Sequence, residues 1–562
     1  MRSNIPSASW HPTRLLAMLG MCLLAASSSN AQSLGHGPLP PPSPPPENPV
    51  TPEKAILGKA LFWDEQLSSD NTVACGTCHR PQSGFSDPRE ARHPGPDMVL
   101  QTPDDFFTSP GIIRSDANHL YQPDAVFGLE VQKTGRRAPD IFGAIYAPEA
   151  FWDGRATSEF RDPKTGAVII PLGGALESQV IGPPVSTAEM AHEARDWDDI
   201  TAKLVTAKPL ALASDLTPDL QAALLAHPDY PALFQQAFGT PDITAVRVAF
   251  AIASYERTLI PERTPYFRWL AGQTQAMTPD QVEGHDQFFN LANCATCHQP
   301  PVFTVHEYSN IGLRPWQDDP GRMDISGLNS DRGKFKIPSL LNAGLRPRFF
   351  HTGEENTLWP GGVGQVYMDG GGPNLDNRDP LLLDLNQVPG VDMAKIMDFV
   401  GNALTDPRVR DGLPPFDRPT LRSERLEQAG GNLYGFGTAA QPGSTAPRIL
   451  AAEPAFPGAN LFRIGVEGGT AGAQARLLLG QTRLAGQLHR GVAMFVRPYP
   501  NRIVAITLED DGQGGGYGTA LLPIPNSPSL IGTQVFAQWF VDDPSAAQGT
   551  VTSEAAVLRI EG

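Results

Sequence analysis

The sequence predicts a mostly α-helical body made of two similar halves, followed by a separate all-β unit. Three observations support this expectation. A five-residue pattern of cysteine and histidine occurs twice, at widely separated positions. Helix-starting signals and helical apolar spacing surround both copies. After about Glu424 the chain changes to short β-rich stretches separated by Gly, Pro and Asn, which favours a sandwich of strands.

Length and charge limit the classes of function. With 562 residues, the chain is long enough for about three to four domain-sized units. Its net charge of −17 repels nucleic acid and anionic membrane surfaces, so we expect neither as a partner. Its 55 glycines and 56 prolines indicate many turns and long ordered loops.

The N-terminal residues predict export. Arg2 and Arg14 precede the apolar run 15–26, and small polar residues follow it up to Ala31. This order is that of a secretory signal peptide over residues 1–31, so we predict cleavage after Ala31 and a periplasmic location. The run is too short for a membrane span of roughly 20 residues, and no later segment is long and apolar enough. A proline-rich linker is expected over residues 32–50.

Helix signals organise the body. A capping threonine followed by proline opens each of three expected helices, and apolar spacing marks two more. The three starts are Thr51-Pro52, Thr217-Pro218 and Thr278-Pro279, and the apolar stretches are residues 243–259 and 393–404. We predict one half of the body over residues 51–240 and the other over residues 241–424.

Residues 425–562 are predicted to form the all-β, sandwich-like unit. The expected strands lie in residues 461–466, 491–496, 502–508, 534–541 and 555–560. Glycine, proline and asparagine separate them, as turns do between strands. Docking of a partner, attachment to the cell surface and stabilisation of the body all remain open as roles for this unit.

The repeated pattern is C-x-x-C-H. Its copies are Cys75-Gly76-Thr77-Cys78-His79 and Cys294-Ala295-Thr296-Cys297-His298. Two thiols about one helical turn apart can each form a thioether to a porphyrin vinyl group, and the following histidine is then left under the iron as its ligand. We therefore predict two covalently bound c-type haems, each in a cytochrome-c-like half.

Two other uses of the cysteines are weaker. A pair of structural disulfides would leave the two adjacent histidines as a coincidence. A zinc site with four cysteine ligands would have to close over the whole segment between the motifs. Haem attachment accounts for the cysteines and the histidines together.

Further motifs surround the two haem motifs in a fixed order. They are Ile56 to Phe62, Arg136-Arg137-Ala138-Pro139, Phe151 to Ala156, Gln179 with Glu189-Met190, and the stretch from Lys334 through Ile337-Pro338-Ser339-Leu340 to Phe350-His351-Thr352-Gly353. In this order they resemble the bacterial di-haem cytochrome c peroxidases, a family that includes the MauG-like enzymes. The resemblance covers about residues 51–422 and does not extend over the β-rich tail.

The resemblance implies an enzyme that reduces hydrogen peroxide to water, with electrons supplied through the second haem by a small cytochrome c or cupredoxin. A MauG-like enzyme would instead use peroxide to oxidise tryptophan or tyrosine of a partner protein. A third possibility, from another class, is a non-catalytic di-haem electron-transfer cytochrome. An electron carrier needs no proton shuttle, so a carboxylate beside an open iron site argues against it.

The same resemblance implies roles for single residues. His79 would be the proximal ligand of the peroxide-binding haem and His298 that of the electron-supplying haem, with Trp152 between the two. Gln179 and Glu189 would lie on the distal side of the first haem. Splitting a peroxide requires a proton to move from one oxygen to the other, which a carboxylate can do as base and then acid. A neutral amide can orient the oxygen species, and an indole offers a site for hole transfer.

Two departures from the family's pattern affect the expected ligands. The loop over residues 83–135 is long and carries His93 and His119, of which His93 is the nearer candidate to cap the first haem at rest. The family often holds a calcium ion between its haem domains, but Arg137 and Arg346 stand where calcium ligands would be. Two arginines make a poor cation site, so calcium is doubtful.

The sixth ligand of the second haem distinguishes the two enzymatic alternatives. The family places a methionine or a tyrosine there, and this chain offers both as neighbours, Tyr367 and Met368. A methionine thioether raises the reduction potential and suits a haem that accepts electrons, whereas a phenolate stabilises oxidised iron. Tyr367 stands three residues before Gly370-Gly371, as in the tyrosine-type sequences, so we favour Tyr367 over Met368.

Overall fold

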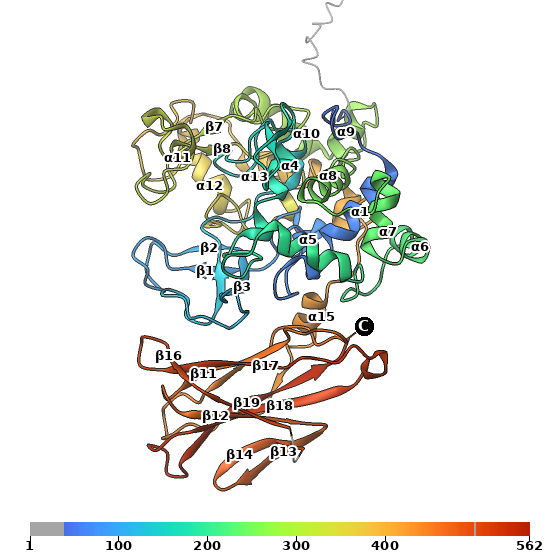
Figure 1. Ribbon diagram of the computed structural model, residues 1–562. Helices are drawn as coiled ribbons and strands as arrows, with labels where there is room; N and C mark the ends of the chain where they lie inside the picture. Colours follow the sequence, from blue (N-terminus) through green and yellow to red (C-terminus); the bar gives the residue numbers. More distant parts are fainter. Residues whose placement is uncertain (1–38, 500–501, 562) are drawn as a thin grey trace, which may run out of the picture. The chain divides into compact units, whose positions relative to one another are not determined.

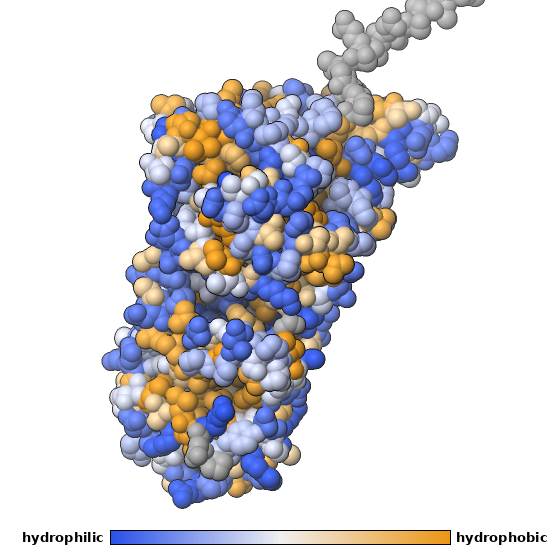
Figure 2. Space-filling view, turned by 45° about the vertical axis from the view of Figure 1, so that its right-hand side comes forward, coloured by the Kyte–Doolittle hydropathy of each residue, from blue (hydrophilic) through white to orange (hydrophobic). Residues whose placement is uncertain are grey.

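The computed structural model of the protein describes residues 39–499 and 502–561. The predicted signal peptide and the first part of the predicted linker lie outside these residues. Among the described residues, none of the helices is both long enough and apolar enough to span a bilayer. Figure 2 shows one face of the molecule, on which hydrophilic and hydrophobic side chains are mixed.

Short helices joined by irregular segments build the region around the two haem motifs (Figure 1). Their bounds are α1 (Pro52–Phe62), α2 (Cys75–Cys78), α3 (Ile141–Ile145), α4 (Ala175–Val180), α5 (Trp197–Thr206), α6 (Pro218–Ala226), α7 (Tyr230–Phe238), α8 (Ala245–Glu256), α9 (Pro265–Leu270), α10 (Pro279–Asn290), α11 (Met323–Ser326), α12 (Gly362–Met368), α13 (Met393–Asp398), α14 (Pro407–Asp411) and α15 (Arg422–Gln428). The predicted starts at Pro52, Pro218 and Pro279 are confirmed. The mostly α class holds only in part, because irregular segments and strands make up much of the chain.

Two helix crossings repeat the same close contact. A Cβ atom at Gly58 of α1 would lie 1.9 Å from the carbonyl oxygen of Ala251 in α8. A Cβ atom at Gly284 of α10 would lie 2.0 Å from the carbonyl oxygen of Lys395 in α13. In both places only glycine lets the two backbones approach so closely. Since α1 and α10 each precede a haem motif, the two crossings agree with an internal repeat.

One hydrophobic core runs through both halves. Leu57 and Phe62 of α1 belong to the same buried cluster as Phe288 of α10 and Phe399, which follows α13. Helix α8 lies in the second predicted half, yet it packs against α1 and α4 of the first. The division at residue 240 therefore stays a prediction, while the shared core joins the two haem motifs in one packed body.

Two-stranded hairpins occupy the long loops. Their strands are β1 (Ala91–His93), β2 (Phe106–Thr108), β3 (Pro110–Ile113), β4 (Val131–Lys133), β5 (Phe160–Arg161), β6 (Val168–Ile170), β7 (Tyr308–Ser309) and β8 (Phe335–Lys336). Strands β1 to β4 lie in the long loop of residues 83–135. Strands β5 and β6 lie in the segment between Trp152 and Gln179, which is longer than the family's pattern leads one to expect.

The C-terminal residues are rich in strands, as predicted. Their strands are β9 (Leu433–Tyr434), β10 (Arg448–Leu450), β11 (Arg463–Gly469), β12 (Gln474–Gly480), β13 (Thr482–His489), β14 (Val492–Arg497), β15 (Ile503–Thr507), β16 (Glu509–Asp510), β17 (Gly516–Leu521), β18 (Gln534–Asp542) and β19 (Thr550–Arg559). One antiparallel sheet has the order β10-β11-β17-β16 and the other β15-β12-β18-β19-β9. Side chains of both sheets, such as Ile464 and Trp539, share one buried core, which is the packing of a sandwich.

The long loop of the first half contacts the β-rich unit. Ile113 and Tyr121 pack in one buried cluster with Leu450 and Tyr517. The main-chain N–H of Tyr121 also donates to the hydroxyl oxygen of Thr519 at 3.0 Å. The far end of this loop is therefore anchored on the sandwich.

Candidate active site

The first haem motif forms part of the wall of a cavity of about 560 Å³. Cys75 and Cys78 begin and end α2, so their side chains stand one turn apart. His79 follows directly, and its Nδ1 lies 2.9 Å from the carbonyl oxygen of Phe85. A carbonyl can only accept, so Nδ1 carries the proton and Nε2 is the nitrogen left for a metal.

The second motif repeats this arrangement in a cavity of about 190 Å³. Cys294, Cys297 and His298 contribute to its wall. The Nδ1 of His298 lies 3.1 Å from the carbonyl oxygen of Phe303. Phe85 and Phe303 both have a φ of 55°, in the left-handed region, which aims each carbonyl back at its histidine. The two motifs thus build the same metal-facing imidazole twice.

The four thiols fit haem attachment better than the alternatives. All four are free in the described residues, and the two pairs line different cavities. No group of three or more His, Cys, Asp or Glu side chains in this part of the chain is arranged to hold a metal ion. Burial raises the pKa of Cys75 and Cys294 to about 12. Neutral thiols one turn apart beside a free Nε2 are the groups that a covalent haem requires.

Gln179 and Glu189 lie together in the first cavity with the attachment cysteines. Gln179 comes from the last turn of α4, and Glu189 follows a short 3₁₀ turn at Pro183–Val185. Burial raises the pKa of Glu189, while the Arg155 guanidinium and a hydrogen bond from Ser186 oppose that rise. A carboxyl group at hydrogen-bond distance from a reacting oxygen can take up a proton as base and return it as acid.

Trp152 lines both cavities. Its indole Nε1 donates to the carbonyl oxygen of Arg137 at 2.8 Å, and its own carbonyl accepts from the main-chain N–H of Lys336 at 2.7 Å. Its ring meets that of His351 edge-on, with 6.2 Å between the centroids. Trp152 therefore belongs to the walls of both cavities.

The two loop histidines lie in different surroundings. His93, at the end of β1, lines the first cavity and stacks on Phe106 with 4.5 Å between ring centroids. Burial lowers its pKa, so its imidazole is neutral near pH 7. His119 does not line this cavity, and its ring packs against His192 at 4.5 Å. Its carbonyl accepts from Arg463 of the β-rich unit.

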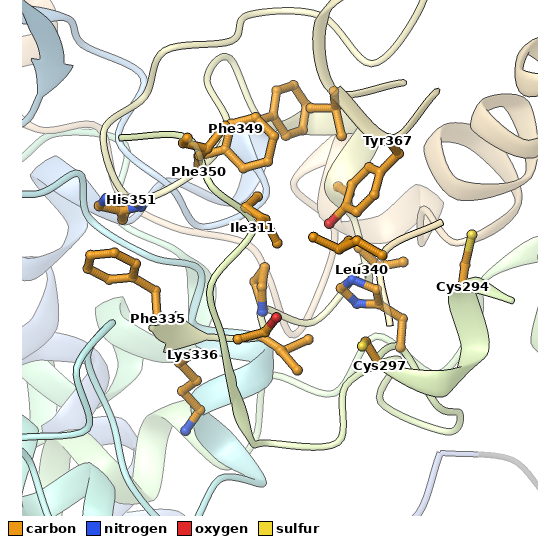
Figure 3. A pocket seen from close by; sticks show the side chains of 18 of the residues that line it. Cys294, Cys297, Ile311, Phe335, Lys336, Leu340, Phe349, Phe350, His351 and Tyr367 are labelled. Carbon is orange, nitrogen blue, oxygen red and sulfur yellow. The ribbon is translucent and has the colours of Figure 1, made fainter. Parts of the chain in front are cut away.

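Of the two neighbours Tyr367 and Met368, only Tyr367 lines a cavity. Both belong to the last turn of α12. Tyr367 lines the second cavity with Cys294 and Cys297 (Figure 3). Met368 is not among the lining residues; its side chain is partly buried against the core. Burial raises the pKa of the Tyr367 phenol, and the two cysteine thiols raise it further.

The two arginines at the expected calcium positions lie in the wall of the second cavity. Arg137 donates to the main-chain carbonyl oxygens of Asp87 and Arg89, and Arg346 donates to that of Ser339 at 2.8 Å. Arg346 also pairs with Asp140 at 3.1 Å. Guanidinium groups thus occupy positions at which a divalent cation would need oxygen ligands.

Among the acidic residues of the first cavity that were not predicted, Glu256 is the one with an unpaired buried oxygen. Glu256 ends α8, lines the cavity, and has one carboxyl oxygen, Oε2, that is buried without a hydrogen-bond partner. Burial raises its pKa to about 8; the Glu177 carboxylate adds to this and Arg257 opposes it. The only signal in the sequence is a glutamate at the end of an otherwise apolar helix face.

Comparisons with known proteins agree with this arrangement. A family model described as di-haem cytochrome c peroxidase matches residues 52–275. The methylamine utilization protein MauG of Methylophilus methylotrophus is 30% identical over 308 residues, which are 54% of this chain and 70% of that protein. The cytochrome c peroxidase Ccp of Escherichia coli K12 is 29% identical over 317 residues, 55% of this chain. That match covers 52% of the Escherichia coli protein, about half of its length.

Solved structures of MauG-like and di-haem peroxidase proteins match this chain at lower sequence identity. A MauG-like protein associated with microbial copper homeostasis is 23% identical, with a TM-score of 0.47 over 67% of this chain and 96% of that chain. The di-haem peroxidase BthA of Burkholderia thailandensis is 20% identical, with a TM-score of 0.41. On the strength of the sequence matches, the chain belongs to the di-haem cytochrome c peroxidase family, which includes the MauG proteins, and the cysteines and histidines of its two cavities fit the two c-type haems of that family.

Proposed function

We propose that this protein is a periplasmic peroxidase. It reduces hydrogen peroxide to water with electrons that a small cytochrome c or cupredoxin delivers to the second haem. Each turnover consumes one peroxide, two protons and two electrons and releases two waters. When bound, the haem iron supplies the electrons that break the O–O bond. The observation that carries the proposal is the buried carboxyl group of Glu189 in the same cavity as the first attachment motif.

Glu189 is the proton-transferring group in this proposal. Its carboxylate takes the proton from one peroxide oxygen and returns it to the other, which then leaves as water. Burial supports this role, because it raises the pKa of the Glu189 carboxyl and so makes the carboxylate a stronger base than an exposed one. Arg155 limits the rise and so keeps the group able to act as a base.

Gln179 and Trp152 have supporting roles. The side-chain amide of Gln179 can donate to an oxygen species in the first cavity without exchanging its own proton. Trp152 offers a short aromatic route between the cavities, since its indole lines both of them. His93 stands in the first cavity as the candidate resting-state cap. His79 and His298 would hold the two haem irons through Nε2.

The division of labour follows the order of the chain. Residues 51–240 would hold the peroxide-binding haem, residues 241–424 the electron-transfer haem, and residues 425–562 the accessory β-rich unit. The export signal at residues 1–31 would bring the chain to the compartment in which c-type haems and small redox donors meet.

The test measures peroxide-dependent oxidation of a reduced small cytochrome c by the holoprotein. Glu189→Gln keeps the size of the side chain but removes the basic carboxylate, so turnover falls by roughly 10² or more. Glu193→Gln is the matched control, because this glutamate is exposed four residues further on and its side chain is 56% accessible. The control keeps its turnover, and both variants keep two haems. Near-normal turnover of Glu189→Gln would remove Glu189 from the mechanism.

A MauG-like oxidation of a partner protein is the second candidate. The position of Tyr367 beside Cys294 and Cys297 favours it, because a phenolate ligand would let the second haem share oxidising equivalents. Burial opposes it, since the phenol must first lose a proton that its surroundings retain. Peroxide reactions with and without a reduced donor separate the two candidates: a peroxidase turns over only with the donor, whereas a MauG-like enzyme is reduced by its protein substrate.

A further inference from the structure

The wall of the second cavity contains three buried nitrogen atoms without partners. They are Nε of Arg137, Nε of Arg346 and Nε2 of His351, and none has a hydrogen-bond partner among the described residues. Arg137 is 2% exposed and His351 is 5% exposed. Buried polar groups are almost always paired, because an unpaired one loses its hydration and gains nothing in return. The two guanidinium N–H groups, together with the His351 ring in the tautomer that carries its proton on Nε2, indicate a ligand with acceptor oxygens.

The positions of the attachment cysteines in the cavity indicate which group supplies these oxygens. Cys294 and Cys297 lie at one side of it, and His351, Phe335 and Lys336 lie at the other (Figure 3). A c-type haem carries its two thioether bonds on adjacent pyrrole rings and its two propionates on the remaining pair. Attachment at the cysteines would therefore turn the propionate edge toward the side on which His351 lies.

We propose that Arg137, Arg346 and His351 form the binding site for the propionate carboxylates of the second haem. The proposal rests on the presence of the haem alone and not on peroxide reduction, so either can fail without the other.

Arg137 supplies the uncompensated charge. Its guanidinium donates to the main-chain carbonyl oxygens of Asp87 and Arg89, the latter at 3.3 Å, which are neutral acceptors. These two bonds fix the plane of the guanidinium, and its Nε–H has no partner. A buried cation without a carboxylate partner is unfavourable, and a propionate would supply the missing negative charge.

Arg346 and His351 are held equally firmly. Arg346 uses one terminal nitrogen for the carbonyl oxygens of Ser339 and Leu341 at 2.8 and 3.1 Å, which leaves its Nε unpaired. The ring of His351 stacks on Phe335 with 3.5 Å between centroids and 15° between planes. Side chains fixed in this way bind a ligand with little loss of rotamer freedom.

Other cations of the same wall are already paired. Arg348 donates to both carboxyl oxygens of Glu90 at 2.8 and 2.9 Å, and Arg314 pairs with Glu354. Lys336 donates to the main-chain carbonyl oxygen of Glu149. Unlike these three residues, Arg137 and Arg346 each keep a buried Nε–H without a partner, although Arg346 also pairs with Asp140 at 3.1 Å.

The site is also connected to Trp152. The main-chain N–H of Arg137 donates to the carbonyl oxygen of His351 at 2.8 Å, and the carbonyl of Arg137 accepts the Trp152 indole. One residue thus positions the tryptophan through its main chain and the haem edge through its side chain. Arg137 is a positioning residue for Trp152 as well as a ligand of the propionate.

The test uses the holoprotein and measures the reduction potential of each haem together with the resonance Raman propionate-bending bands. Loss of a neighbouring cation favours the oxidised haem, so Arg137→Gln and Arg346→Gln each lower the potential of the second haem. We expect a shift of about tenfold in the oxidised-to-reduced ratio, which is 59 mV for one electron. The propionate band of the second haem moves in both variants, and His351→Gln moves the band with a smaller change in potential.

Arg348→Gln is the matched control, because Arg348 lies in the same wall but is committed to Glu90. It leaves the propionate band in place. Should Arg137→Gln fail to fold, Arg137→Lys keeps the charge and removes only the fork of donors, and Arg346→Gln and His351→Gln test the other two contacts. An unchanged band and potential of the second haem in folded, fully loaded variants would overturn the proposal. A change confined to the first haem would assign Arg137 to that haem and overturn it too.

Discussion

The two cavities share an attachment geometry and differ in the rest of their walls. In each, two cysteines one turn apart and a histidine tied to a phenylalanine carbonyl face the interior. The first cavity, of about 560 Å³, adds two buried acids, Glu189 and Glu256. The second, of about 190 Å³, adds the Tyr367 phenol and Arg346, whereas Arg137 lines both cavities.

This difference separates the residues that attach the cofactor from the residues proposed to take part in the reaction. The short local motif that supplies the attachment cysteines and the histidine is the same in both cavities. Chemistry depends on side chains that come from distant segments, such as α4 and α8 for the first cavity and α12 for the second. Buried glutamates suit a cavity in which protons are proposed to move.

The largest expected effect tests whether the two attachment sites are independent. Removing both cysteines of one motif, as Cys75→Ala with Cys78→Ala or Cys294→Ala with Cys297→Ala, should leave one covalent haem in each protein. The thioether bonds are local, so the other site should keep its haem. A pyridine haemochrome assay on the denatured protein measures two haems in the wild type and one in each variant. Loss of both haems from either variant contradicts independent attachment.

A spectroscopic change comes next and tests what distinguishes the second cavity. If Tyr367 ligates the iron, Tyr367→Phe alters the ferric near-infrared charge-transfer region and Met368→Leu does not, because only the tyrosine lines the cavity. A methionine-type band that disappears only in Met368→Leu would defeat the tyrosine assignment. That result would also favour the peroxidase function over the MauG-like function.

The smallest effect concerns the second acid of the first cavity. Burial raises the pKa of Glu256 from 4.5 to about 8, so the folded protein holds a proton that the unfolded chain releases above about pH 4.5. The stabilisation of the folded state by protonated Glu256 is fully present below about pH 4.5 and is lost as the pH rises toward 8. Glu256→Gln cannot release the proton, so its urea unfolding midpoint should fall less between pH 5 and pH 8 than that of the wild type. Glu193→Gln should keep the wild-type slope, and an equal slope in Glu256→Gln would show that this carboxyl does not titrate on unfolding.

Much of the local structure could be predicted. The threonines before Pro52 and Pro279 correctly predicted helices that begin at these prolines. Among the expected β-rich stretches, residues 491–496 and 534–541 coincide closely with β14 and β18. These features depend on neighbouring residues, because a cap, a turn or an alternating face is complete within a few positions. The strand β12 was missed, although it lies inside its sheet, between β15 and β18.

The sequence by itself determined where two haems attach, since the thiols and the imidazole of each motif are contiguous in the chain. Tertiary structure alone decided what surrounds them. It brought Trp152 into both cavity walls, chose Tyr367 over its neighbour to face the second cavity, and buried Glu256 and His351 with atoms unpaired. Adjacent residues of a helix point about 100° apart, so the packing of α12 decides which one reaches a cavity. Burial, which sets the pKa of an acid, likewise depends on contacts between distant segments that no local pattern records.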